Sequence, residues 1–211
     1  MSRRILIVTA VQAEADAIGR PHGTFVVAGG IGRTNAAAAT TAAILSDGPF
    51  RWIINAGVAG ALPRSELGVG DIVIANKCVY FEEGLMTQDG FQDMEKMGFC
   101  LGNFSGNDVP VDPWMLERLS QLGSVAPIAT VATCSGSDEQ AHAVYERTGC
   151  VCEAMEGAAV VHAAGRLGAP GIEIRAISNS TGNRDSQNWD MKLALNNLGQ
   201  VVNNAITALW K

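Results

Sequence analysis

Apolar runs that end near glycine alternate along the whole chain with alanine-rich segments of helical periodicity. Short apolar runs predict strands, and apolar residues at helical spacing predict helices. The predicted strands lie near residues 4–10, 24–28, 51–55, 71–80, 126–133 and 171–177. The predicted helices lie near residues 34–46, 113–122, 138–147, 156–167 and 190–209. This alternation predicts an α/β fold, a three-layer sandwich in which helices cover both faces of a mainly parallel mixed sheet.

The chain has the size and composition of one folded domain. Its 211 residues are 47% hydrophobic, enough to fill a core without cross-links. Only 17% of the residues are charged, and no run of like charge suggests a disordered tail. We therefore expect a single domain over residues 1–211. The formal net charge of −6, with scattered lysine and arginine, argues against nucleic acid and anionic membranes as partners.

The N-terminus and the cysteines indicate where the protein works. The apolar run after Arg3 and Arg4 is short and reaches Gln12 and Glu14 where a signal peptide would be cleaved, so it predicts a strand. No apolar stretch approaches the roughly eighteen residues of a membrane span. We expect a cytoplasmic protein. The five cysteines, without CxxC pairs or histidines at metal spacing, predict reduced thiols and no zinc site: Cys78, Cys100, Cys134, Cys150 and Cys152.

A glycine turn within residues 24–40, TFVVAGGIGRTNAAAAT, partly matches the fingerprint of dinucleotide-binding folds. Gly30 and Gly32 fit the first two glycines, but Asn35 stands where the third is required. A tight turn in which Thr34 or Asn35 caps the next helix explains these residues as well as a phosphate cradle does, and we favour it. The turn therefore disfavours a nicotinamide, and we expect no cofactor and no metal.

Polar side chains stand where predicted strands end. Asn179 closes an apolar strand, Glu14 follows the first strand, and Glu156 opens a small apolar helix. Gly57 belongs to a run of small residues at another strand end, where a ligand can approach the backbone closely. Plain structural explanations remain open, since Glu14 could be a solvated charge at a helix N-terminus and Gly57 a turn glycine. Together these residues predict recognition of a small polar ligand at the carboxyl edge of the sheet.

Other features carry less chemistry. His22, His142 and His162 lack a serine or aspartate at a triad spacing, and we interpret them as structural. The long irregular stretch 84–110 predicts a functional or mobile loop. Trp189 has no interpretation beyond anchoring the last helix.

Six motifs in one order carry a resemblance: AVQAEADAI, AGGIGRTNAA, INAGVAG with LGVGDIVIA, SGSDEQA, EAMEGAA and IRAISN. The order resembles the nucleoside phosphorylase and nucleosidase superfamily, which cleaves the N-glycosidic bond of nucleosides. The likeness covers most of the chain and is weakest between Phe81 and Ala126. It implies that superfamily's fold. It also implies a catalytic Glu14, a ribose-binding Met155–Glu156 pair, and an Arg175 that helps to hold water or phosphate near the anomeric carbon.

Two departures from the superfamily pattern change the expected chemistry. Adenine-specific nucleosidases have Ser-Asp where this chain has Ser178-Asn179, and their NTGSAGG becomes NAGVAG, with Val58 after Gly57 in place of the serine near the water. An Asn amide can donate to the O6 of a 6-oxopurine and accept from its N7–H. Asn179 therefore argues for hypoxanthine or guanine as the leaving group. We find no glycine-and-arginine phosphate motif of the phosphorylases, so hydrolysis is favoured over phosphorolysis.

The stretch ISNSTGNRDSQNWD resembles the futalosine hydrolases, the nucleosidases of the alternative menaquinone pathway. Their substrate is an inosine-like nucleoside with a carboxyphenyl ketone on its 5′ side, and hydrolysis yields hypoxanthine and dehypoxanthine futalosine. The 5′ carboxylate needs a cation. Arg184 is the first candidate, with Arg33 and Lys77 as lesser ones, and an ion pair of Arg184 with Asp185 that shapes the loop is an equal alternative.

The resemblance implies a dissociative cleavage. Glu14 would be the general base that orients water, Glu156 would hold the ribose hydroxyls and oppose the cationic ring, and Asn179 would stabilise N7-protonated hypoxanthine. The proton source stays open between water and Asp138. The remaining alternatives are a 6-oxopurine nucleoside phosphorylase, a methylthioadenosine/adenosylhomocysteine-type nucleosidase and a catalytically silent nucleoside-binding module. The superfamily also implies a homodimer or a higher homo-oligomer.

Overall fold

The computed structural model describes residues 4–211, so residues 1–3 of the predicted domain, Arg3 among them, lie outside the described residues. The strands are β1 (Ile5–Thr9), β2 (Thr24–Ala28), β3 (Trp52–Ala61), β4 (Ile72–Tyr80), β5 (Gly84–Thr87), β6 (Gly90–Asp93), β7 (Asp108–Pro110), β8 (Ser124–Thr130), β9 (Cys152–Ala154) and β10 (Gly171–Ser180). The helices are α1 (Gln12–Ile18), α2 (Arg33–Asp47), α3 (Pro113–Leu119), α4 (Asp138–Thr148), α5 (Gly157–Arg166) and α6 (Met191–Leu209), with short 3-10 turns η1 (Ser120–Leu122) and η2 (Arg184–Ser186). Every predicted strand and helix is present.

Eight strands form one mixed sheet in the order β10-β4-β8-β9-β3-β1-β2, with β7 added to β4. Five pairings are parallel, namely β1–β2, β1–β3, β3–β10, β4–β8 and β8–β9, and three are antiparallel, namely β4–β10, β3–β9 and β4–β7. Because β10 pairs with both β3 and β4, the pairings run from β3 through β10, β4, β8 and β9 back to β3. This closure sets β3 and β10 side by side from Gly171 opposite Ile53 to Ser180 opposite Ala61, so their carboxyl ends share one edge.

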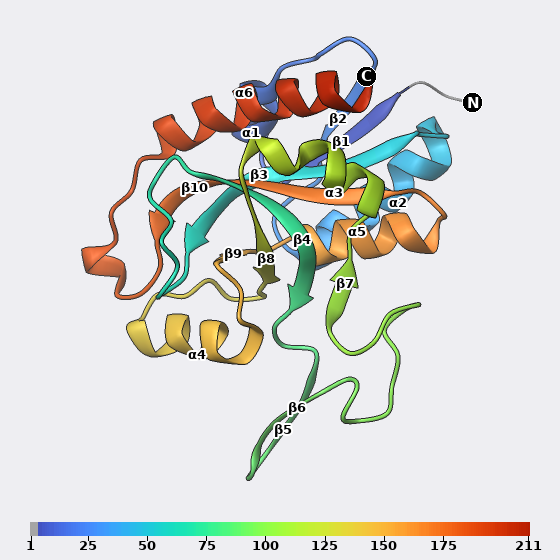
Figure 1. Ribbon diagram of the computed structural model, residues 1–211. Helices are drawn as coiled ribbons and strands as arrows, with labels where there is room; N and C mark the ends of the chain where they lie inside the picture. The colour runs from blue at the N-terminus through green and yellow to red at the C-terminus, as the bar shows by residue number, and fades with distance from the viewer. Residues whose placement is uncertain (1–3) are drawn as a thin grey trace.

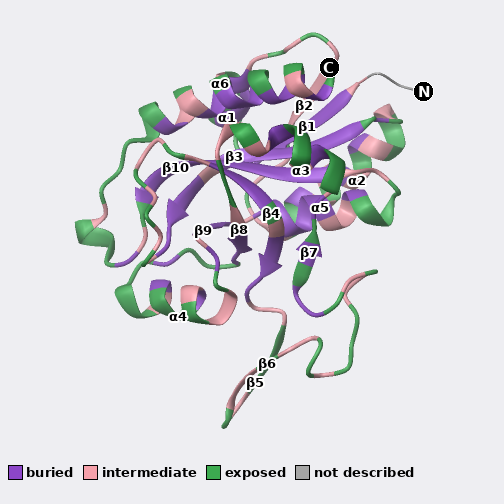
Figure 2. Ribbon diagram, viewed as in Figure 1, coloured by how far each residue is buried: buried purple, intermediate pink, exposed green. Residues whose placement is uncertain are grey.

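Helices cover the sheet on two sides, as Figure 1 shows. α6 packs against α1, α3, β3 and β10, while α2 and α5 pack against each other and against the other face of the sheet. The strands β1, β3 and β10 are almost wholly buried. The helices turn apolar stripes inward (Figure 2), as α6 does with buried residues at helical spacing from Ala194 to Leu209. The predicted three-layer α/β fold is confirmed. Within residues 4–211 no helix combines the length and the apolar character needed to cross a membrane.

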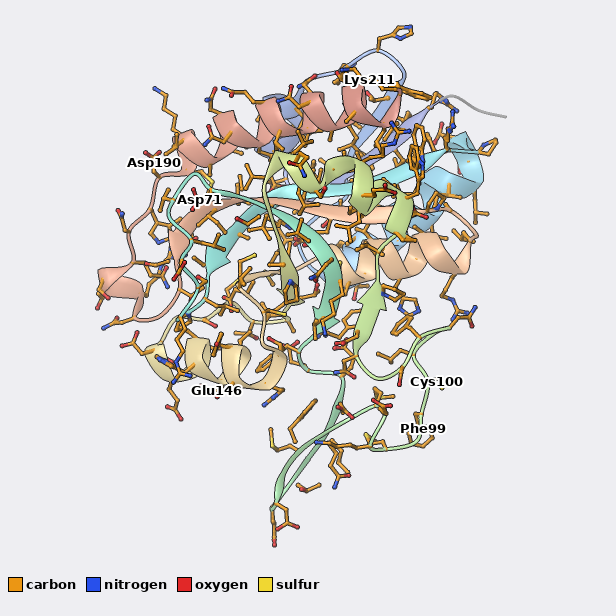
Figure 3. All side chains as sticks on the ribbon, viewed as in Figure 1. Asp71, Phe99, Cys100, Glu146, Asp190 and Lys211 are labelled. Carbon is orange, nitrogen blue, oxygen red and sulfur yellow. The ribbon has the colours of Figure 1, made fainter. Side chains whose placement is uncertain are left out.

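The segment predicted as an irregular loop over 84–110 is partly regular, and here the prediction was wrong. β5 and β6 form an antiparallel hairpin that projects from the body, and β7 returns the chain to β4. Phe99 and Cys100 lie on the same projecting segment (Figure 3). Strands of three or four residues are too short for an alternation of apolar and polar residues to stand out, which explains why the sequence did not reveal them.

Candidate active site

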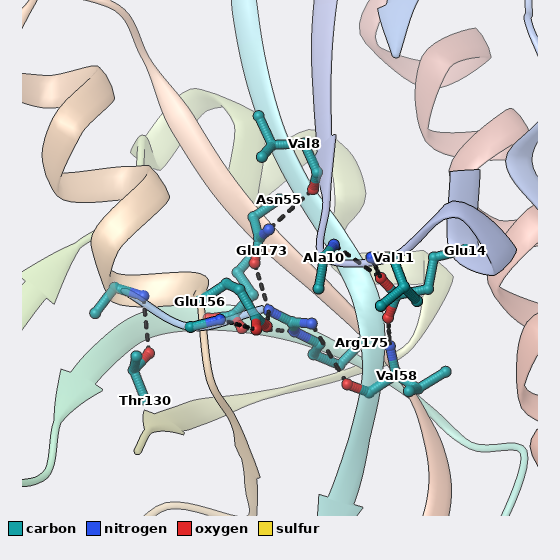
Figure 4. A network of polar contacts seen from close by, with 12 residues as sticks. Val8, Ala10, Val11, Glu14, Asn55, Val58, Thr130, Glu156, Glu173 and Arg175 are labelled. Atoms are coloured by element: carbon teal, nitrogen blue, oxygen red, sulfur yellow. Dashed lines mark hydrogen bonds and ion pairs between the residues drawn. The ribbon is translucent and has the colours of Figure 1, made fainter. Parts of the chain in front are cut away.

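Glu14 is buried in the first turn of α1, directly beyond the end of β1. Its Oε2 accepts hydrogen bonds from the backbone N–H groups of Ala10 (2.9 Å) and Val11 (3.2 Å), and its Oε1 accepts one from the N–H of Val58 (2.9 Å) (Figure 4). The residue is only 3% exposed. Three backbone donors offset the cost of burying a carboxylate and leave it little freedom to turn. The alternative of a solvated helix charge is therefore wrong.

Arg175 is a buried arginine at the centre of the site, projecting from β10. Its Nε donates to Glu173 Oε1 at 2.7 Å, and its Nη1 donates to the backbone oxygen of Val58 at 3.4 Å. Its Nη2 donates to Asn55 Oδ1 and, at 3.4 Å, to Glu156 Oε2. The guanidinium therefore joins β3, β10 and the start of α5 through every one of its nitrogen atoms.

The charges around Arg175 are mostly negative. Burial by itself lowers the pKa of Arg175, but the charges of Glu173, Glu156 and Glu14 act the other way and raise this pKa above its ordinary value. The Nδ2 of Asn55 donates to the backbone oxygen of Val8 at 2.9 Å, which orients the Oδ1 of the same amide toward Arg175 as an acceptor. The site thus sets three carboxylates against one permanently charged guanidinium.

Glu156 occupies the N-cap position of α5 and is 4% exposed. Its Oε1 accepts from the backbone N–H of Gly32 at 2.9 Å, while its Oε2 faces Arg175. The glycine turn before α2 therefore supplies a donor to a site carboxylate. The predicted side-chain cap of α2 is absent, since Gly32 itself is the N-cap and Asn35 donates instead to the backbone oxygen of Ile31 at 2.8 Å.

Gly57 on β3 permits the close packing of the acid and the arginine. A Cβ added at this position would overlap Arg175 Nη1 and would lie 2.6 Å from Glu14 Oε1. Only a residue without a side chain lets both groups lie against the strand. The turn explanation offered for this glycine is wrong, because Gly57 lies inside β3.

Asn179 lies near the carboxyl end of β10 and is 6% exposed. Its Oδ1 accepts from the hydroxyl of Ser178 at 2.8 Å, and its Nδ2 donates to the backbone oxygen of Ser180 at 2.8 Å. Each amide atom keeps one further hydrogen-bonding capacity, because an amide nitrogen has two hydrogens and an amide oxygen two lone pairs. The backbone of Asn179 forms an isolated bridge with Trp189, which brings the following loop back beside it.

The loop after β10 is fastened to the loop before α4. Asp138 accepts from the backbone N–H of Asn183 at 2.9 Å, and Arg184 N–H donates to the backbone oxygen of Gly136 at 3.1 Å. Gln187 Nε2 donates to the backbone oxygen of Ser135 at 3.1 Å. Asp138 is exposed and its described carboxylate contact is with this loop, so the structure places it as a loop brace.

Arg184 and Trp189 form a stacked pair on that loop. The guanidinium carbon lies 4.6 Å from the centre of the indole ring, and both side chains share Gln187 Oε1, at 3.2 Å from Arg184 Nη1 and 3.0 Å from Trp189 Nε1. Within the described part of the chain Arg184 has no ion pair with Asp185, so that alternative is wrong.

Arg33 and Lys77 are already paired with acids. Arg33 Nη1 lies 3.3 Å from Glu82 Oε2 and 2.5 Å from Glu83 Oε1. Lys77 Nζ lies 2.5 Å from Asp108 Oδ2, on the wall of a hollow of about 770 Å³ between the β5–β6 hairpin and α4. Among the described contacts, neither side chain is bonded to Glu14 or Arg175.

Cys134 lies on the loop before α4. Cys134 is exposed at the surface but partly desolvated, and this desolvation together with the charges of Glu153 and Glu156 raises its pKa to about 11, while Arg184 acts to lower it.

The structure also shows residues that sequence reasoning missed. Glu173 and Asn55 are polar residues inside otherwise apolar strands, which was an available signal. Glu153, on β9, accepts from the N–H and the hydroxyl of Ser135, both at 2.6 Å, and so holds the loop before α4. Burial raises the pKa of Glu153, although the bonds from Ser135 oppose this. Met155, by contrast, packs on a small apolar cluster next to Glu156.

The histidines lie outside the contacts of Glu14 and Arg175. His142 bonds to the backbone oxygen of Asp138 within α4. His162 Nδ1 lies 3.4 Å from the hydroxyl of Tyr80, and burial, followed by the charge of Arg166, lowers the pKa of His162. Among residues 4–211 no cluster of three or more histidine, cysteine, aspartate or glutamate side chains is arranged to hold a metal ion.

The chain is similar in sequence and in fold to known proteins. The sequence model of the Phosphorylase superfamily matches residues 18–210. The chain is 35% identical to a futalosine hydrolase of Acidothermus cellulolyticus, over 100% of this chain and 93% of that protein, and 32% identical to one of Streptomyces coelicolor, over 98% and 97%. The fold is similar to that of the futalosine hydrolase of Helicobacter pylori, with a TM-score of 0.82, 18% identity and 98% of each chain covered.

Proposed function

Because this chain belongs to the phosphorylase superfamily and, within it, to the futalosine hydrolases, we propose that it hydrolyses the N-glycosidic bond of futalosine. The products are hypoxanthine and dehypoxanthine futalosine, and the reaction serves the alternative menaquinone pathway. The observation that carries the proposal is the buried cluster of Glu14, Glu156 and Arg175, which lies beside the middle of β3 and β10 and just beyond the carboxyl end of β1.

Glu14 is the proposed general base. Its two oxygens are held by three backbone N–H groups, so the carboxylate is oriented before substrate binds. A fixed acceptor of this kind lowers the cost of aligning a water molecule with the anomeric carbon. Glu156 is the proposed partner of the ribose hydroxyls and opposes the positive charge that develops on the ring.

Hydrolysis is favoured over phosphorolysis by the charges of the site. Arg175 already donates to Glu173, Asn55, Val58 and Glu156, and the polar contacts described for these residues within 4–211 bring in no second basic side chain. A phosphate dianion needs uncompensated donors, usually arginine or lysine. Three carboxylates around one guanidinium repel such an anion and tolerate a neutral water molecule.

Asn179 is the proposed reader of the purine. Its amide retains one donor hydrogen and one acceptor lone pair beyond its bonds to Ser178 and Ser180. These are the two groups that a 6-oxopurine needs at O6 and at a protonated N7. Asp138 braces the loop in this structure, so we propose water as the proton source.

Arg184 is the proposed partner of the 5′ carboxylate. The described contacts of its side chain are with the neutral groups of Trp189 and Gln187, so its charge is uncompensated, whereas Arg33 and Lys77 are neutralised by acids. An arginine stacked on an exposed indole presents both a cation and an aromatic edge. That combination suits a planar carboxyphenyl group.

We also propose a cytoplasmic homodimer or higher homo-oligomer. The projecting segment around the β5–β6 hairpin exposes Leu85, Met86 and Phe99, at 48%, 64% and 61%. Apolar side chains gathered on a projection support contact with another protein surface. Size-exclusion chromatography with light scattering tests the assembly, and a monomer at all concentrations would contradict it.

The decisive experiment is base release from futalosine, inosine and methylthioadenosine, each with and without phosphate, measured by chromatography. The expected result is phosphate-independent release of hypoxanthine from futalosine. Phosphate-dependent cleavage of inosine would make the protein a phosphorylase instead, and adenine release would indicate a methylthioadenosine-type nucleosidase. A ligand-induced shift of the melting temperature without any base release would support a binding module.

A further inference from the structure

Glu173 is a buried carboxylate that the proposed site roles leave unexplained. It lies two positions before Arg175 on β10, so both side chains leave the strand on the same face. It is 0% exposed, and the part of β10 from Gly171 to Ile177 is otherwise apolar apart from Arg175. Burying a carboxylate is costly even when it is paired, and an apolar residue would fill this place without that cost. The charge at this position therefore needs a functional reason.

The space for this carboxylate is provided by Gly157, the first residue of α5. A Cβ added at Gly157 would overlap the Glu173 carboxylate. Glu173 therefore lies against the N-terminus of a ten-residue helix, where the backbone dipoles favour negative charge. Glu156 is the N-cap of the same helix, so one helix start places two acids beside Arg175.

The two acids share Arg175 unequally. The contact from Arg175 Nε to Glu173 Oε1 is 2.7 Å, whereas that from Nη2 to Glu156 Oε2 is 3.4 Å. The first is a short charge-assisted hydrogen bond, and the second is at the outer limit for one. Arg175 is thus bound closely by Glu173 and only loosely by Glu156.

We propose that Glu173 is a positioning residue for the glycosidic cleavage. By pairing closely with Arg175, it prevents the guanidinium from forming a tight ion pair with Glu156, and Glu156 Oε2 stays available to ribose hydroxyls. The inference rests on the proposed function, because it requires a ribosyl substrate at Glu156.

The first test is Glu173→Gln, which keeps the volume and one acceptor oxygen but removes the charge. We expect hypoxanthine release from futalosine with a raised KM and a lowered kcat, and a kcat/KM reduced by at least about tenfold. A variant that merely folds less well contains less active enzyme, so it shows a lower kcat with KM unchanged. A KM equal to that of the wild type would overturn the proposal.

The second test is a double-mutant cycle with Glu156→Gln. If Glu173 acts through Glu156, adding Glu173→Gln to Glu156→Gln should reduce kcat/KM by no more than about twofold. Glu153→Gln is the matched control, since Glu153 is a buried acid bonded to Ser135 and has no described contact with Arg175. In the double variant, the reductions in kcat/KM caused by Glu153→Gln and by Glu156→Gln should multiply. If the reductions in kcat/KM caused by Glu173→Gln and Glu156→Gln also multiply, the inference is wrong.

A second variant tests the same proposal if Glu173→Gln does not fold. Glu173→Ala combined with Gly157→Ala refills the vacated space with a methyl group, and the same cycle is measured with that pair. The activity of the wild type distinguishes a failure of the proposed function from a failure of the role proposed for Glu173. A wild type that releases no base from any nucleoside overturns the proposed function and this inference with it, whereas an active wild type with a multiplicative cycle overturns only the role of Glu173.

Discussion

Val58 and Glu14 are 44 positions apart in the sequence, yet the backbone N–H of Val58 donates to Glu14 Oε1 at 2.9 Å. The backbone oxygen of Val58 accepts from Arg175 Nη1 at 3.4 Å. The main chain makes both contacts, so the valine that stands in place of the superfamily's serine still holds the acid and the arginine. What the valine removes is one hydroxyl near the position proposed for water.

Glu14→Gln should reduce kcat about 10²- to 10⁴-fold, because an amide cannot accept the proton of water. The NH₂ group of the glutamine would also face backbone N–H groups from which the carboxylate now accepts hydrogen bonds. The measurement is steady-state hypoxanthine release from futalosine. Asp16→Asn is the control, since Asp16 is an exposed acid on the same helix that bonds only to Gln12 among its described side-chain partners. Near-normal turnover of Glu14→Gln would remove its assigned role.

Asn179→Asp should shift the choice of base. A carboxylate cannot donate to the O6 of hypoxanthine, so kcat/KM for futalosine should fall about ten- to hundredfold, the equivalent of roughly 1–3 kcal/mol. Release of adenine from methylthioadenosine should rise relative to that of hypoxanthine. Asn196→Asp, on the exposed side of α6, is the control for the added charge. An unchanged ratio between the two nucleosides would contradict the recognition argument.

Gly57→Ala should damage both stability and activity. The added Cβ would displace Arg175 Nη1 and Glu14 Oε1 from β3, and we expect a loss of about 1–3 kcal/mol in the free energy of unfolding, as for other overpacked cores. The free energy of unfolding measured by urea denaturation and the turnover of futalosine should both fall. Gly165→Ala is the matched control, because a Cβ at that helical glycine meets nothing within 4 Å and should stabilise the helix by about 0.5–1 kcal/mol. A fully active Gly57→Ala would show that the close packing is dispensable.

Arg184→Met should raise KM for futalosine at least about tenfold, because one charge-assisted contact with the 5′ carboxylate is lost. KM for inosine, which lacks that carboxylate, should stay within about twofold of the wild type if inosine is cleaved at all. Arg118→Met is the control, since Arg118 also lies over a tryptophan, Trp114, at 5.0 Å, but on α3. If both nucleosides respond equally to Arg184→Met, the role in 5′ recognition is wrong.

Cys134 should react slowly with iodoacetamide despite its exposure. Desolvation and then the charges of Glu153 and Glu156 raise its pKa to about 11, and only the thiolate is nucleophilic. The rate of alkylation of its peptide, followed by mass spectrometry, should rise about tenfold per pH unit between about pH 8 and pH 10. Glu156→Gln removes one negative charge, so it should lower this pKa and accelerate the reaction at a given pH. A plateau below about pH 9 would contradict this assignment.

The sequence by itself determined the succession of strands and helices and the identity of the chemical groups. Long apolar runs and helical periodicity are local properties, and they predicted the long elements, although β3 continues to Ala61, six residues beyond its predicted end, and α1 was not among the predicted helices. The resemblance carried by the order of motifs also pointed to Glu14, Arg175, Glu156 and Asn179. Glu14, Glu156 and Asn179 were visible besides as polar residues at the ends of predicted strands or at the start of a predicted helix. The short strands β5, β6, β7 and β9 were missed because three or four residues carry too little pattern.

Only the tertiary structure decided how those groups are paired. Whether Arg33 is free or neutralised by Glu82 and Glu83 depends on segments far apart in the chain. Whether Arg184 meets Asp185 or Trp189 depends on how the loop folds, and whether Glu173 or Glu156 binds Arg175 more closely depends on how β10 packs against α5. The closure of β3 onto β10 brings Val58 and Gly57 to Arg175. Electrostatic partners are chosen by distance and burial, and a linear pattern of residue types specifies neither.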